Sequence, residues 1–131
     1  MDQKSPRRIV VADDNEDSAE SFAMLLSFSG HEVRIAHDGA AALDAVRNFR
    51  PDVAFLDIGM PGLTGYDVAQ RIKELNFPKR PFVIAITGFD QPVNRVAAEQ
   101  TGFDLYMVKP VEPEKLLWTL RHLPGSAAEN S

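Results

Sequence analysis

The sequence contains no cysteine, which excludes disulfide bonds and thiolate metal sites and fits a reducing compartment. No apolar run approaches the roughly 20 residues that a membrane-spanning helix needs. Positive charge is also scarce, because 14 Lys and Arg face 19 Asp and Glu and leave a net charge of -5. A general nucleic-acid surface would be basic. The shortage of positive charge therefore argues against nucleic-acid binding, and the lack of a long apolar run argues against insertion into a membrane.

A chain of 131 residues, 44% of them hydrophobic and 25% charged, is most simply one globular domain. Its first residues run into an apolar segment without the features of a signal peptide. We expect a cytoplasmic domain over residues 8–123, with an N-terminal tail over 1–7 and a C-terminal tail over 124–131. The initial methionine and the short tails slightly favour a complete small protein.

Five short hydrophobic runs, rich in β-branched or aromatic residues, predict five β-strands. They span residues 9–12, 33–36, 53–56, 82–86 and 105–108. Several are apolar on both faces, as strands of a parallel sheet are when helices cover both sides. Segments with helical periodicity separate the runs. The pattern predicts a doubly wound α/β sandwich, in which right-handed crossovers join parallel strands.

Five helices are predicted between and after the strands. The first helix is expected to run from its N-cap Asn15 to Gly30, the second from Gly39 to just before Pro51, and the third from just after Gly65 to Leu75. The fourth is expected at about 91–101, and the fifth from Pro113 to about Leu123. The fourth helix has a thin apolar stripe, which is consistent with a loosely held element. In the fifth helix we expect four leucines to face the core: Leu116, Leu117, Leu120 and Leu123.

Four of the five runs end on polar residues, which are Asp13-Asp14, Asp57, Thr87 and Lys109. Ligands of α/β sheets bind at the carboxyl ends of the strands, so these side chains are expected to converge. Taken singly, each has an ordinary explanation, since aspartates cap helices or open turns, threonine and glycine form turns, and lysines lie at surfaces. Together they predict a site for a divalent cation and a phosphoryl group.

The chemistry of this set is that of phosphoryl transfer. Crowded carboxylates repel one another unless a cation neutralises them, and oxygen-only ligands suit Mg²⁺ or Mn²⁺. The reaction needs in-line geometry and positive charge around the transferred group. We interpret Asp57 as the nucleophile that forms an aspartyl phosphate, Asp13 and Asp14 as metal ligands, and Lys109 and Thr87 as the groups that receive the phosphoryl oxygens.

Four fragments occur in order at appropriate spacing: Val-Ala-Asp13-Asp14-Asn, Leu-Asp57-Ile-Gly-Met-Pro61-Gly-Leu-Thr-Gly65, Ile-Thr87-Gly and Val-Lys109-Pro110. Through them the chain resembles the CheY-like receiver domains of two-component response regulators over about residues 8–123. The resemblance implies a flavodoxin-like fold with strand order 2-1-3-4-5. It also implies Mg²⁺-dependent phosphorylation of Asp57 by a histidine kinase or a histidine phosphotransfer protein. The Lys109-Pro110 peptide is often cis in such domains.

The same resemblance implies a conformational switch, in which the hydroxyl of Thr87 moves toward the phosphoryl group and the ring of Tyr106 rotates inward. The alternative is that Tyr106 is an ordinary strand aromatic. Gly59 and Phe89 stand where the family often has polar side chains, so we expect slow loss of the phosphoryl group unless a phosphatase helps. The backbone carbonyl of Gly59 remains available as a metal ligand. The output partner is not defined by the sequence, and the implied state is a monomer or a phosphorylation-dependent homodimer.

Other functions were weighed against the same residues. A flavin-binding electron carrier would need a hydroxyl- and glycine-rich loop where this chain has Asp-Asp-Asn-Glu-Asp. A phosphohydrolase with an aspartate nucleophile would normally place a second acid at the position of Gly59. A receiver that has lost its phosphoacceptor function is disfavoured because all five site residues are present. We expect a regulatory domain rather than an enzyme, either a stand-alone regulator or the excised receiver of a hybrid histidine kinase.

The remaining chemical groups predict no further site. His31 and His37 flank the second strand, away from the expected carboxylate cluster, and His122 lies near the end of the last helix. Trp118 on that helix is expected to be half-buried packing.

Overall fold

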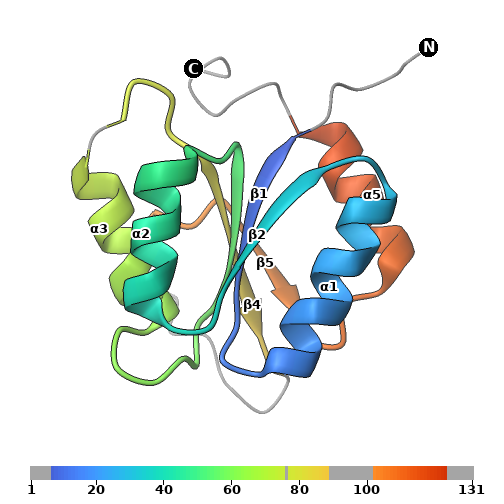
Figure 1. Cartoon of the computed structure of the whole chain (residues 1–131), viewed down its shortest axis with the longest axis horizontal. Coiled ribbons are helices and arrows are strands. Elements are labelled where there is room, and N and C mark those ends of the chain that lie inside the picture. The colour runs from blue at the N-terminus through green and yellow to red at the C-terminus, as the bar shows by residue number, and fades with distance from the viewer. Residues whose placement is uncertain (1–6, 76, 89–101, 124–131) are drawn as a thin grey trace.

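A computed structural model describes residues 7–75, 77–88 and 102–123 of the chain (Figure 1). Strands and helices alternate along it. The elements are β1 (Arg8–Ala12), α1 (Glu16–Phe28), β2 (Glu32–Ala36), α2 (Gly39–Phe49), β3 (Val53–Asp57), α3 (Gly65–Leu75), β4 (Phe82–Thr87), β5 (Leu105–Val108) and α5 (Pro113–His122). The expected fourth helix, at about 91–101, and Phe89 lie outside the described residues. No helix of the described ranges is long and apolar enough to cross a membrane.

The five strands form one parallel sheet in the order β2-β1-β3-β4-β5, which confirms the expected topology. Every residue of β3 and of β4 is buried, as the apolar character of their sequences on both faces predicts. The edge strands β2 and β5 are mostly exposed. Asp57 and Thr87, predicted to follow their strands, are the last residues of β3 and β4.

Helices cover both faces of the sheet, with α2 and α3 on one side and α1 and α5 on the other (Figure 1). Successive residues of a strand point to opposite faces, and β1 shows this directly. Ile9 and Val11 join the core beneath α1 and α5, whereas Val10 and Ala12 join the core beneath α2 and α3. The result is the predicted three-layer sandwich, in which all strands end at the lower edge of the sheet in Figure 1.

The helix ends follow local chemistry. The side chain of Asn15 caps α1 by accepting a hydrogen bond from the backbone of Ser18 at 2.9 Å, as predicted. Asp38 caps α2 in the same way through the backbone of Ala41 at 2.8 Å. Proline opens α5, where its missing N–H costs no helical hydrogen bond.

Two expectations about the last helix and the tails need correction. Leu116 and Leu120 are buried and Leu123 packs against the same core, but Leu117 is only partly buried. Trp118 is 55% exposed, which agrees with the expected half-buried packing, and its ring stacks on His122 with centroids 3.9 Å apart. Arg7, the last residue of the expected N-terminal tail, is buried and donates to the carbonyl of Leu123 at 2.9 Å.

Candidate functional site

The first strand delivers one buried and one exposed carboxylate to the lower edge of the sheet. Asp13 is 6% exposed, and its backbone N–H donates to the carbonyl of Ala36 at 3.0 Å, which continues the ladder between β1 and β2. Its Oδ1 accepts the backbone N–H of Asn15 at 3.0 Å. Asp14 is exposed to solvent. Asp13 is therefore fixed by the backbone, whereas Asp14 keeps contact with water.

Asp57 ends the central strand β3 and is 5% exposed. Its Oδ1 accepts the backbone N–H of Gly59 at 2.8 Å, so the turn after the strand orients the carboxylate. The strand pairs with β1 on one side and β4 on the other, so groups from both neighbours surround Asp57. In doubly wound sheets the crevice beside β1 and β3 is the usual ligand position.

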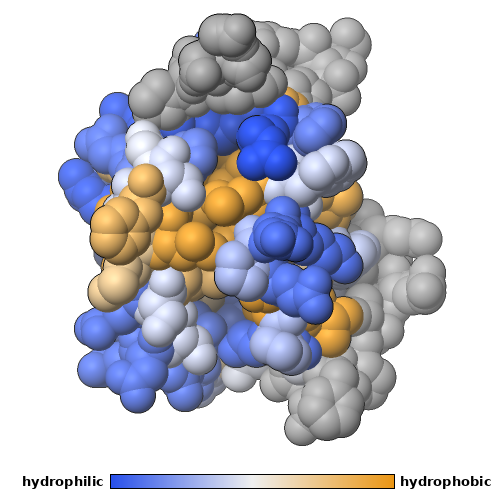
Figure 2. Space-filling model, turned by 90° about the vertical axis from the view of Figure 1, so that its right-hand side faces the viewer, coloured by the Kyte–Doolittle hydropathy of each residue, from blue (hydrophilic) through white to orange (hydrophobic). Residues whose placement is uncertain are grey.

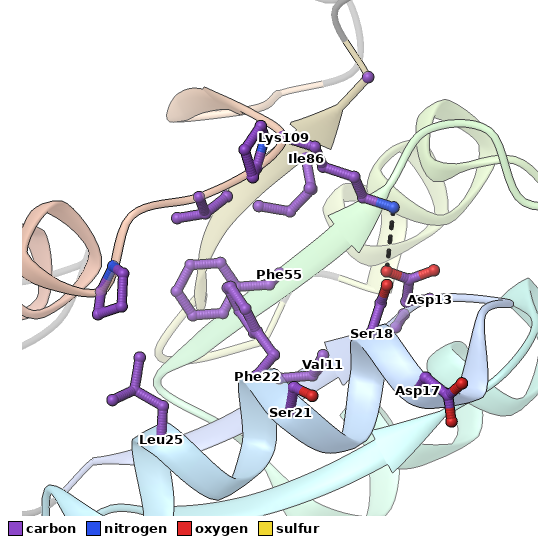
Figure 3. A pocket seen from close by; sticks show the side chains of 15 residues that line it. Val11, Asp13, Asp17, Ser18, Ser21, Phe22, Leu25, Phe55, Ile86 and Lys109 are labelled. Atoms are coloured by element: carbon purple, nitrogen blue, oxygen red, sulfur yellow. Dashed lines mark ion pairs between the residues drawn. The ribbon is translucent and has the colours of Figure 1, made fainter.

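Lys109 joins the two buried carboxylates. Its Nζ lies 3.1 Å from Oδ2 of Asp57 and 3.2 Å from Oδ2 of Asp13, and Figure 3 shows the side chain reaching across to Asp13. The backbone N–H of Lys109 donates to the carbonyl of Thr87 at 2.7 Å. The Lys109-Pro110 peptide is cis, as the resemblance implied. The lysine that ends β5 thus has the anionic partners that the sequence predicted.

The three carboxylates form a cluster that could hold a metal ion. One oxygen each from Asp13, Asp14 and Asp57 lies within 4.8 Å of the others. An all-oxygen donor set with one exposed member fits a hard divalent cation that retains several waters. Gly59 is exposed directly beside Asp57, so a backbone carbonyl is at hand as a further oxygen.

Electrostatics at the site reflect the crowding of like charges. Burial raises the pKa of the Asp13 carboxyl, and the charge of Asp57 adds to this increase, whereas hydrogen bonds from Asn15 and Lys109 oppose it. Burial acts to lower the pKa of Lys109, but the hydrogen bonds and charges of Asp57 and Asp13 outweigh burial and raise it. Lys109 therefore stays protonated at neutral pH, while the surroundings of Asp13 disfavour the charged form of its carboxyl group.

The expected switch residues lie on neighbouring strands. Thr87 is 1% exposed at the end of β4, directly after the residue that pairs with Asp57 in the ladder. Tyr106 on β5 pairs in register with Ala85 and is 43% exposed, with its ring 5.8 Å from that of Phe103. The buried hydroxyl and the outward ring are the arrangement from which an inward rotation would start.

One histidine is closer to the site than the sequence indicated. Nδ1 of His37 lies 3.2 Å from the backbone carbonyl of Asp13, so the expectation that it stands away from the cluster is wrong. The turn from β2 to α2 runs beside the end of β1 and places the ring there. His31, by contrast, accepts the backbone N–H of Arg7 at the opposite end of β2, and His122 bonds within α5.

A cavity of about 790 Å³ adjoins the site, and no pattern in the sequence indicated it. It lies between α1 and the segment from β5 to α5, and Figure 2 shows it as an apolar hollow in the surface. Phe22, Leu25 and Phe55 line it, while Asp13 and Lys109 stand at one end (Figure 3). Helical periodicity predicts which side of α1 faces the sheet, but it cannot show that the space beside Phe22 stays open.

A five-stranded sheet of order 2-1-3-4-5 with carboxylates and a lysine at its carboxyl edge defines a receiver-type signalling domain. Comparison with known proteins agrees. The profile of the response regulator receiver domain matches residues 9–121, and the chain belongs to this family. It is 38% identical over 130 residues to the response regulator MprA of Mycobacterium bovis, with 94% of this chain covered. The alignment covers 55% of MprA, so the chain spans about half the length of the curated relatives it matches.

Solved structures show the same fold. A CheY-like receiver domain protein from Methanospirillum hungatei superposes with a TM-score of 0.80 at 31% identity, over 89% of this chain and 92% of that one. The chemotaxis protein CheY4 of Vibrio cholerae superposes with a TM-score of 0.83 at 27% identity, over 92% of this chain and all of its own. The chain is thus a response regulator receiver domain, a regulatory class of domain in two-component signalling.

Proposed function

We propose that Asp57 is the phosphoacceptor of this receiver domain, which we take to span residues 8–123. The observation that carries the proposal is the position of Asp57: a buried carboxylate at the end of the central strand, 3.1 Å from the ammonium of Lys109 and grouped with Asp13 and Asp14. Asp13 lies on the neighbouring strand and Asp14 faces solvent. Asp57 alone has the other site groups on both sides of it.

The donor in this proposal is a phosphohistidine of a histidine kinase or of a histidine phosphotransfer protein. An oxygen of Asp57 attacks phosphorus in line with the bond from phosphorus to the imidazole nitrogen. The new O–P bond forms as the P–N bond breaks, and the nitrogen keeps the electron pair and takes up a proton. Lys109, already within ion-pair distance of Asp57, then pairs with the negatively charged phosphoryl oxygens. The hydroxyl of Thr87 donates a hydrogen bond to the same oxygens.

Asp13, Asp14, Asp57 and the carbonyl of Gly59 would hold Mg²⁺, with Mn²⁺ as an acceptable substitute. When bound, the ion neutralises the carboxylates and stabilises charge on the phosphoryl oxygens. The proposal is supported by the carboxylate oxygens of Asp13, Asp14 and Asp57, which lie within 4.8 Å of one another.

Phosphorylation changes the packing of the face around Tyr106 in this proposal. The hydroxyl of Thr87 moves toward the new phosphoryl group and leaves space, which the ring of Tyr106 occupies from its exposed position. The altered face then binds an output protein or a second copy of the domain. This is the action of a cytoplasmic regulatory domain that assists only its own phosphorylation and dephosphorylation. Gly59 donates its backbone N–H to Asp57. It has no carboxyl group to act as the second acid that a phosphohydrolase would need at this position, so the site does not favour that function.

The test is phosphoryl transfer to the whole chain, followed by intact mass. With acetyl phosphate and Mg²⁺ we expect the wild-type chain to gain one phosphoryl group, which EDTA prevents. Asp57→Asn is expected to gain none, because an amide cannot form the acyl phosphate, whereas Asp52→Asn, just before the opposite end of the same strand, should gain it normally. Equal phosphorylation of the Asp57→Asn variant would refute the assignment.

A further inference from the structure

A second cavity, of about 370 Å³, lies at the opposite edge of the sheet. Its walls come from the end of α2 and from the segment that leads into β4, at the upper edge of the sheet in Figure 1. Asp52 in its lining precedes β3, and Asp57 ends that strand. At a rise of about 3.3 Å per residue, the Cα atoms of these two residues are about 16 Å apart. This cavity, named here the upper pocket, is therefore separate from the phosphoryl site.

The walls of the upper pocket are apolar and stiff. Val46 and the ring of Phe77 contribute to them together with three prolines, Pro51, Pro78 and Pro81. Each proline fixes its own φ angle, so the segments on both sides of the pocket have little freedom to collapse into it. Small-molecule sites are commonly preformed, mostly apolar hollows with a few polar groups, of roughly 300–1,000 Å³. The upper pocket meets that description at its lower limit.

Positive charge collects around these walls in a chain whose net charge is -5. Arg50, Lys79 and Arg80 line the pocket, against the single carboxylate of Asp52. Arg80 is occupied, since it forms a two-pronged ion pair with Asp104 at 2.8 and 3.3 Å. Within the described ranges no carboxylate lies within ion-pair distance of Arg50 or Lys79, so two cations at the pocket lack an anionic partner.

Arg50 occupies a position that its side chain does not favour. It ends α2 with φ 52° and ψ 61°, and it is the one non-glycine residue with positive φ in the described part of the chain. Glycine is the usual residue at this turn because a Cβ atom costs free energy there. The arginine nevertheless sets its guanidinium over the ring of Phe77, 4.8 Å from the centroid. Backbone strain often occurs at functional sites, so the position of Arg50 motivates a functional hypothesis for this pocket.

We propose that the upper pocket binds a small anion with a planar ring, of the class of a nucleoside monophosphate. Arg50 and Lys79 supply charge for the phosphate, because a guanidinium fork and an ammonium are the usual phosphate partners. Phe77 and the prolines supply the surface for the ring. Oδ2 of Asp52 accepts the backbone N–H of Arg8 at 2.8 Å, and Oδ1 accepts an N–H of the base in this proposal.

The experiment is calorimetric titration of the whole, unphosphorylated chain with AMP, adenosine and inorganic phosphate. We expect AMP to bind at least tenfold more tightly than either fragment, since the pocket uses both the ring and the charge. Amide chemical shifts should change at the non-proline residues that line the upper pocket, such as Arg50, Asp52 and Lys79. Equal affinity for AMP and phosphate, or shifts confined to the lower edge near Asp57, would overturn the proposal, as would the absence of AMP binding.

Two variants and a matched control complete the test. Arg50→Gly removes the cation and relieves the backbone, so it should weaken AMP binding at least tenfold while the melting temperature is kept or raised. Lys79→Gln should weaken it severalfold. Arg47→Gln removes a cation from the same last turn of α2, but Arg47 pairs with Asp44 and does not line the pocket, so binding should be unchanged. A loss in Arg47→Gln equal to that in Arg50→Gly would show diffuse charge attraction and reject the site.

Discussion

At the scale of single residues, the site is a balance of three charged side chains. The ammonium of Lys109 lies between the carboxylates of Asp13 and Asp57, at 3.2 and 3.1 Å. One cation cannot neutralise two buried anions, and the exposed carboxylate of Asp14 adds a third negative charge nearby. Burial, and to a smaller extent the charge of Asp57, raises the pKa of Asp13. A second cation bound at the site would therefore reduce the repulsion among these carboxylates.

The first prediction concerns Asp13→Asn. Because burial and the charge of Asp57 disfavour the Asp13 carboxylate, its removal should stabilise the metal-free protein at pH 7, by about 1 kcal/mol, the ordinary scale of one substitution. The same change should diminish the rise in melting temperature that Mg²⁺ produces in the wild-type chain. Thermal melts with and without Mg²⁺ measure both effects.

Asp17→Asn is the control for this prediction, since Asp17 is an exposed acid in the first turn of α1 and not one of the clustered carboxylates. It should leave the Mg²⁺ increment unchanged. An Asp13→Asn chain that is less stable than wild type without metal, yet gains as much from Mg²⁺, would contradict the description of the site.

The second prediction concerns His31 and pH. Burial, and secondarily the charge of Arg7, lowers the pKa of His31, and its Nδ1 accepts the backbone N–H of Arg7 at 3.1 Å. The unfolded chain therefore takes up a proton at higher pH than the folded one, so His31 makes stability fall as pH drops through about 6.5. His31→Gln retains an acceptor that does not titrate. Urea titrations at pH 7.5 and 5.5 should show a smaller loss for His31→Gln, and an equal loss would exclude this role.

At the scale of elements, the turn between β3 and α3 holds the site in register. Gly65 begins α3 against this turn, and a Cβ atom there would lie 2.7 Å from Cα of Ile58 and 2.9 Å from the carbonyl oxygen of Asp57. Both neighbours are backbone atoms, which cannot move aside as a flexible side chain could. The position of Asp57 thus depends on the close approach of a helix that begins with glycine.

The third prediction is that Gly65→Ala destabilises the protein by about 1–3 kcal/mol, the usual cost of overpacking, and slows phosphorylation of Asp57. Alanine is the better helix former by about 1 kcal/mol, so a net loss isolates the steric clash. Urea titration and phosphorylation by acetyl phosphate measure the two effects. Arg71→Ala, on an exposed position of the same helix, should change neither. A Gly65→Ala chain as stable as wild type would show that the backbone of the turn can move to accommodate the added Cβ atom.

The elements also show how far the sequence leads. Short apolar runs and helical spacing predicted every described strand and helix to within a few residues, because each period must match a face that the core buries. The convergence of Asp13, Asp57 and Lys109 was predictable too, since parallel strands end at one edge. The open cavity beside Phe22 and the left-handed Arg50 were not, because both depend on how distant segments pack.

At the scale of the whole molecule, the domain presents distinct working regions on one sheet. The lower edge holds the carboxylates and Lys109, the face at β5 exposes Tyr106, and the upper edge carries the upper pocket. Four large apolar side chains are exposed on β5 and α5: Leu105, Tyr106, Val108 and Trp118. In the proposed switch, β4 and β5 link the lower edge to Tyr106, because these two strands pair directly.

The central claim is that Asp57, of the three clustered aspartates, becomes the acyl phosphate. The most direct test phosphorylates the whole chain, reduces it with borohydride, which converts an acyl phosphate to homoserine, and maps the product by peptide mass spectrometry. The account predicts homoserine at position 57 and unmodified aspartate at Asp13 and Asp14. Homoserine at position 13 or 14, with Asp57 intact, would contradict it.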